Sequence, residues 1–111
     1  MPALNFKLQF AEAVRNKTKR QTIRKLRVVP IRLGDTLYLY TGMRTKSCEK
    51  IGETFCRAAV PILIDGPIIK LAGRELPIKE RSALAVNDGF LDALEMCAFF
   101  SPGLEGQLII W

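Results

Sequence analysis

The residues best suited to chemistry lie in one short basic segment, Lys17-Thr18-Lys19-Arg20-Gln21-Thr22-Ile23-Arg24. Cationic neighbours disfavour the protonated form of Lys19, so we expect a lowered pKa and a better nucleophile or base. Thr22 supplies a hydroxyl that a neutral lysine would activate, and Arg24 a planar fork for a phosphate, carbonyl or carboxylate. An acid brought close by folding, such as Asp88, would raise the pKa of Lys19 again or relay a proton.

A simpler interpretation of the same residues stays open. Lys19 and Arg24 would then be surface cations, Thr22 a strand-forming residue, and Asp88 part of a helix end.

The residue types that are missing narrow the chemistry. There is no histidine, and the three cysteines, Cys48, Cys56 and Cys97, form no C-x-x-C pair, so we expect neither a metal site nor a cofactor. Without histidine every Ser–His or Cys–His pair is excluded, and catalysis would use Lys, Asp, Glu, Tyr, Ser or Thr. The cysteines are most simply inert free thiols of a cytosolic protein.

Positive charge is concentrated in the first half of the chain. Residues 1–61 carry 13 basic and 4 acidic side chains, whereas residues 62–111 carry 4 basic and 7 acidic ones. Residues 15–32 contain eight basic side chains and no acid. Such a field favours polyanions and predicts contact with nucleic acid or phosphate, although a solvated face that aids solubility is the alternative.

Hydrophobic periodicity and turn residues predict the secondary structure. Helices are expected at residues 7–15, 79–86 and 90–99. Asn16 would take the left-handed conformation that ends the first helix. In the third helix, Leu91, Leu94 and Ala98 would lie on one stripe. Extended segments are expected at 21–29, 36–41, 52–64 (one long strand bulged at Pro61), 68–71 and 108–111. This pattern predicts a single α+β domain over residues 1–111, a small β-barrel of about five strands with about three short helices. No signal peptide or membrane span is apparent, which favours a cytoplasmic protein without a membrane partner.

The strand at 36–41 carries two aromatic side chains close to the basic segment. Alternation would bury Leu37 and Leu39 and leave Tyr38 and Tyr40 on the other face, where they would either stack bases or pack in the core. Arg44 and Lys46 follow this strand and would extend the positive track or form an ordinary charged loop.

Taken in order along the chain, these segments resemble the ASCH domain family. The resemblance rests on the first helix, the K-x-x-T-I-R run over 19–24, the turn and strand Gly34-Asp35-Thr36-Leu37, and the late Ala85-Val86-Asn87-Asp88-Gly89-Phe90. It covers essentially the whole chain, and residues 39–46 resemble small phage- or prophage-borne members. The sequence departs from the family pattern at Lys17, where the loop glycine is expected, and at Asp88, where the family has glutamate.

The resemblance implies a PUA-like barrel and an RNA-related function. Some members of the family deacetylate an acetylated cytidine with a lysine, a threonine and a glutamate, and one subgroup resembles ribonucleases. Matched position by position, these roles fall on Lys19, Thr22 and Asp88, with the family arginine at Arg24.

Three hypotheses follow for the function. The first is an RNA- or nucleotide-binding domain whose basic cleft contains Lys17, Arg20, Arg24, Tyr40, Arg44 and Lys46. The second is a metal-independent hydrolase of the same fold, an amidohydrolase on acetylated cytidine or a ribonuclease, using Lys19, Thr22 and Asp88. The third is a phage-borne protein-interaction module whose basic half docks on an acidic surface.

Overall fold

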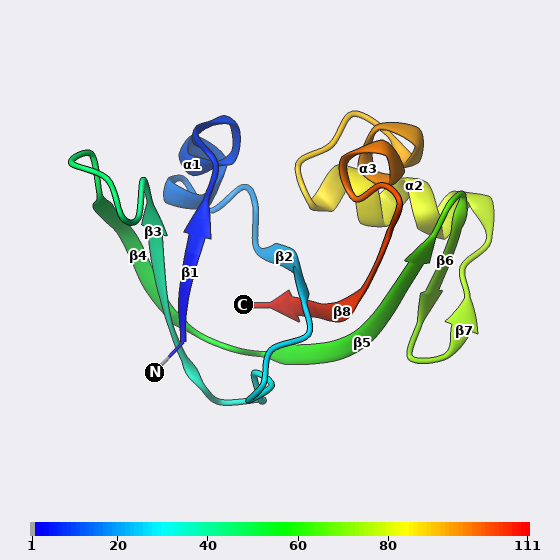
Figure 1. Ribbon diagram of the computed structural model, residues 1–111, viewed down its shortest axis with the longest axis horizontal. Helices are drawn as coiled ribbons and strands as arrows, with labels where there is room; N and C mark the ends of the chain where they lie inside the picture. Colours follow the sequence, from blue (N-terminus) through cyan, green and yellow to red (C-terminus); the bar gives the residue numbers. More distant parts are fainter. Residues whose placement is uncertain (1) are drawn as a thin grey trace.

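The computed structural model describes residues 2–111, which form three helices and two sheets (Figure 1). The strands are β1 (Ala3–Phe6), β2 (Gln21–Lys25), β3 (Thr36–Thr41), β4 (Glu49–Phe55), β5 (Ala58–Asp65), β6 (Ile68–Leu71), β7 (Arg74–Glu75) and β8 (Gly103–Ile110). The helices are α1 (Leu8–Arg15), α2 (Ile78–Asn87) and α3 (Ala93–Phe99). The α+β class expected from the sequence is confirmed. Over residues 2–111 the strands form sheets of three and five strands and no closed barrel, so the predicted barrel of about five strands is not confirmed.

The larger sheet has the antiparallel order β2-β8-β5-β6-β7. The single bulged strand predicted over 52–64 is wrong, because the chain breaks at Cys56 and Arg57 and passes from β4 in the small sheet to β5 in the large one. Pro61 lies within β5, opposite Gln107. Its carbonyl accepts from Ala72 N, so the proline nitrogen also faces this side, on which β6 has just ended.

The smaller sheet has the order β1-β3-β4, with β1 parallel to β3. The strand β1 is only four residues long and was not predicted from the sequence. Leu37 and Leu39 are buried and Tyr38 and Tyr40 are half-buried, as the alternation predicted. Leu4 and Phe6 of β1 add to the same buried face.

The helices lie over the two ends of the sheets. In Figure 1, α1 stands beside β1 at one end and the α2–α3 pair stands at the other, with β2 running between them. The helix predicted at 90–99 begins instead at Ala93, because Asp92 Oδ1 accepts from Glu95 N and caps it. Leu91 and Leu94 are 79% and 80% exposed, and Met96 is the buried residue of α3, so the predicted stripe is wrong.

No helix of the described part of the chain has the length and apolar composition needed to cross a bilayer. The longest, α2, contains ten residues.

Candidate functional site

A pocket of about 360 Å³, here called the central pocket, opens between the β1–α1 junction, β2 and the ends of α2 and α3. Its volume lies within the range of about 300–1,000 Å³ usual for small-ligand sites. The polar and charged residues of its lining are Asn5, Lys7, Lys19, Thr22, Arg24, Lys25 and Asp88. Aromatic side chains form its remaining wall, namely Phe6, Phe10, Phe90, Phe99 and Phe100.

The centre of this pocket is a buried ion pair. Lys19 Nζ lies 3.3 Å from Asp88 Oδ2 and also donates to the Asp88 carbonyl oxygen, and the two side chains are 2% and 5% exposed. The Lys19 ammonium lies 5.0 Å from the centroid of the Phe10 ring. Both charges are shielded from water, so the positions of the two side chains are set by the protein groups around them.

The loop after α1 turns Lys19 toward the pocket. Lys19 N donates to Ala13 O at 2.9 Å, and the turn is made by Lys17, whose φ is 67°. The prediction that Asn16 would adopt the left-handed conformation is wrong, since its φ is −87°. Lys17 stands where the ASCH pattern has glycine, and it adopts a backbone conformation that glycine adopts without strain.

Asp88 comes from the end of α2 and is held from two sides. Gln21 of β2 donates from Nε2 to Asp88 Oδ1 at 3.3 Å and to Leu84 O at 3.2 Å. Gly89 follows with a φ of +100°, and a Cβ there would lie 2.9 Å from Phe10 Cδ1. The glycine therefore lets the end of α2 approach the Phe10 ring beside Lys19.

Burial shifts both members of the pair toward their neutral forms. It lowers the pKa of Lys19, with the Asp88 charge acting in the opposite direction. It likewise raises the pKa of Asp88, against the effects of Lys19 and Gln21. The lowered pKa expected for Lys19 thus arises mainly from burial, and the like charge of Arg24 is a smaller cause. Burial therefore opposes the charged form of both groups, whereas their mutual attraction favours it.

Thr22 and Arg24 lie on β2 beside this pair. Arg24 Nε donates to Thr22 Oγ1 at 3.0 Å, and Arg24 Nη2 donates to the Asn5 carbonyl at 2.6 Å. The guanidinium also lies 4.8 Å from the centroid of the Phe6 ring, and burial lowers the pKa of Arg24 to about 10. Thr22 Oγ1 accepts from Arg24, and a hydroxyl that accepts one hydrogen bond can also donate one.

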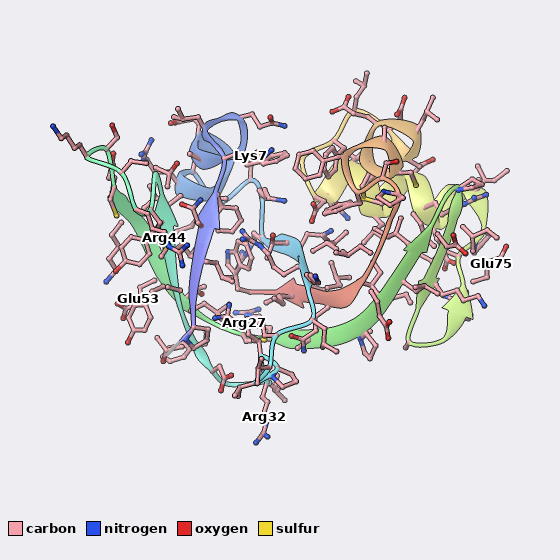
Figure 2. The ribbon with its side chains drawn as sticks, viewed as in Figure 1. Lys7, Arg27, Arg32, Arg44, Glu53 and Glu75 are labelled. Carbon is pink, nitrogen blue, oxygen red and sulfur yellow. The ribbon has the colours of Figure 1, made fainter. Side chains whose placement is uncertain are left out.

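The other predicted nucleic-acid residues lie elsewhere. Lys17 and Arg20 line a separate hollow of about 220 Å³ beside Trp111, whose carbonyl accepts from Arg20 Nε. Tyr40 is on β3, and Arg44 and Lys46 are exposed residues of the β3–β4 turn (Figure 2 labels Arg44). The structure therefore brings Lys19, Thr22, Arg24 and Asp88 into one pocket and distributes the remaining predicted residues over other surfaces.

Several residues of the pocket were not predicted from the sequence. Gln21 contacts Asp88 directly, but a glutamine that starts a strand has no distinctive signal. The aromatic wall is assembled from positions far apart in the chain, of which only the pair Phe99-Phe100 stands out in the sequence.

The rest of the structure offers fewer groups suited to catalysis or to ligand binding. A larger hollow of about 490 Å³ lies beside the β2–β3 connection, lined by residues such as Arg27, Val28, Pro30 and Asp35, but it lacks a buried charged side chain. Over residues 2–111 no group of three or more His, Cys, Asp or Glu side chains is placed to hold a metal ion. The cysteines are free thiols, and burial raises the pKa of Cys56 and Cys97.

Comparisons of the chain with protein-family models, with curated proteins and with solved structures found no match. The resemblance to the ASCH family therefore stays a prediction, and the function has to be inferred from the pocket itself.

Proposed function

We propose that the chain is an RNA- or nucleotide-binding domain of the cytoplasm, similar to ASCH domains, and that the central pocket accepts one nucleotide. The observation that carries the proposal is that a buried Lys19–Asp88 pair, the Thr22 hydroxyl and the Arg24 guanidinium share a concavity with five phenylalanines. We further propose that the two open sheets are a variant of the PUA-like barrel that such domains adopt.

The aromatic wall suits a flat heterocycle. Phe10, Phe90 and Phe99 contact one another with ring centroids 5.2–6.1 Å apart, so the wall is a rigid cluster rather than isolated rings. Stacking of a base on an aromatic side chain is worth about 1–3 kcal/mol and does not depend on which base it is.

The polar groups suit the edge of a base. Thr22 and Arg24 donate, and the Asp88 carboxylate accepts, so carbonyl and amino groups of a heterocycle would each find a partner. These side chains are already held by hydrogen bonds within the pocket, which reduces the ordering cost of binding.

Titration of a short labelled single-stranded RNA at low salt tests this proposal. We expect binding that weakens as salt rises, because phosphate contacts release counterions. Arg24→Gln should weaken binding at least about tenfold, since it removes a charged donor from the pocket. Arg44→Gln removes the same charge from the β3–β4 turn and is the matched control. Absence of binding to any RNA or nucleotide at low salt would refute the proposal.

A second candidate, hydrolysis of an amide on a modified nucleoside, is favoured by the shifted Lys19–Asp88 pair. A neutral Lys19 would accept the proton of an attacking water or hydroxyl, and a protonated Asp88 would donate to the leaving amine. Incubation with acetylated cytidine tests this candidate, and a separate incubation with RNA tests the ribonuclease alternative. Turnover that disappears in Lys19→Ala and persists in Lys46→Ala supports it, and no turnover by the unmodified chain refutes it.

A further inference from the structure

Two lysines that line the central pocket are paired with no carboxylate of residues 2–111. Lys7, between β1 and α1, and Lys25, the last residue of β2, both line the pocket and are both exposed. Neither forms an ion pair with a carboxylate of residues 2–111. They differ in this respect from Lys19, whose charge is paired with Asp88.

The lining of the pocket has an excess of positive charge. It contains four cations, Lys7, Lys19, Arg24 and Lys25, and a single carboxylate, Asp88. With Lys19 and Asp88 paired, three positive charges are left without a counter-ion in the lining. An uncharged nucleoside would neutralise none of them, whereas a phosphate monoester carries a charge of about −1.5 to −2 at neutral pH.

The residues that line the pocket also differ in how far they are exposed to solvent. The Lys19–Asp88 pair and the rings of Phe6, Phe10 and Phe90 are buried, whereas Phe99 is 40% exposed and both lysines are exposed. Lys7 Nζ lies 4.7 Å from the centroid of the Phe99 ring, so the side chain extends from the β1–α1 junction to α3. Figure 2 shows Lys7 between α1 and α3. A ligand with its ring on the phenylalanines would therefore present its substituents to Lys7 and Lys25.

We infer that the ligand carries a phosphate, as a nucleotide does and a nucleoside does not. Lys7 and Lys25 bind this phosphate, and the base lies against the aromatic wall of the pocket. The inference rests on the proposed function and makes it more specific, because it excludes a free nucleoside as the preferred ligand. The phosphate belongs either to a mononucleotide or to the backbone of single-stranded RNA, and the same two lysines serve both.

Calorimetric titration with the common ribonucleosides, their 5′-monophosphates, a short single-stranded RNA and inorganic phosphate tests the inference. The monophosphates or the RNA should bind at least about tenfold more tightly than the nucleosides, and the double variant Lys7→Gln, Lys25→Gln should remove that difference. Lys46→Gln, Lys79→Gln changes the net charge equally and should retain the difference. A preference for RNA over the monophosphates identifies the backbone as the source of the phosphate.

Two results would overturn the inference, and they differ from failure of the proposed function. Equal affinity for nucleoside and monophosphate would remove the phosphate role and leave nucleoside binding intact. Inorganic phosphate that binds as tightly as the monophosphate would show that the base contributes nothing. Absence of binding to every ligand would refute the proposed function itself.

Discussion

Lys19 Nζ and Asp88 Oδ2 lie 3.3 Å apart, although 69 residues separate the two positions in the chain. Lys19 is placed by the turn at Lys17 after α1, and Asp88 by the last turn of α2. The pair thus joins the two helical ends of the molecule across β2. Both residues line the central pocket.

Removal of one member of the pair is expected to destabilise the fold strongly. Asp88→Ala leaves Lys19 buried without a counter-charge, which typically costs about 3–5 kcal/mol. Urea unfolding of the variant measures this cost. Glu80→Ala removes the exposed Arg74–Glu80 pair and should change stability little. The double variant Lys19→Met, Asp88→Leu should be more stable than Asp88→Ala, and a double variant that is no better would contradict a buried charged lysine.

The pH dependence of stability follows from the raised pKa of Asp88. Because the folded-state pKa lies above the ordinary value of 3.8, the folded chain holds this proton more tightly than the unfolded chain does. Stability should therefore increase as the pH falls through the folded pKa of Asp88 toward 3.8, relative to Asp88→Asn, which cannot titrate there. Carbon-13 titration of the Asp88 carboxyl gives the pKa directly, and a midpoint below 3.8 would contradict the account.

Gly89→Ala should disrupt the contact between the end of α2 and Phe10. The new Cβ would lie 2.9 Å from Phe10 Cδ1, at a φ of +100° that alanine rarely adopts. Gly73→Ala separates the two effects, because Gly73 also has a positive φ, +81°, but has no atom within 4 Å of a new Cβ. We expect a loss of about 1–2 kcal/mol for Gly73→Ala from the backbone alone, and a further loss of about 1–3 kcal/mol for Gly89→Ala from overpacking. Equal losses would show that Phe10 moves freely.

Lys17→Gly should stabilise the turn that delivers Lys19. The φ of 67° costs a residue with a Cβ about 1–2 kcal/mol, part of which is offset by the greater freedom of glycine in the unfolded chain. A net gain of roughly 0.5–1 kcal/mol is expected in thermal or urea unfolding. Lys17→Ala loses the same charge but keeps the Cβ, so it should show no such gain; a gain of equal size would assign the effect to charge.

Local patterns predicted the elements whose own residues have a clear alternation or helical period. Strands at 36–41 and 68–71 and the helix at 79–86 follow from alternation, turn residues and helical periodicity, and they are found with similar bounds. The break at Cys56 could not be predicted, because it depends on which sheet each half joins. Leu91 and Leu94 have a periodicity typical of a buried face, but the face of α3 that packs is chosen by the neighbouring elements.

The candidate site was predictable only in part for the same reason. The spacing of Lys19, Thr22 and Arg24, taken with the family resemblance, selected residues that do line the central pocket. The basic run as a whole was assigned to one cleft, whereas the turn at Lys17 sends Lys17 and Arg20 to a different hollow from Lys19. Local sequence does not tell to which side a turn directs each side chain. It also does not tell that phenylalanines far apart in the chain will form one wall.

Chemical-shift mapping during titration with a ribonucleoside monophosphate tests most directly whether the central pocket is the binding site. The account predicts the largest changes at the amides of Lys19, Thr22, Arg24 and Gly89 and in the ring signals of Phe10 and Phe99, with little change at Arg44 or Trp111. Changes centred on Trp111 and Arg20, or on the β3–β4 turn, with the central pocket unaffected, would contradict it.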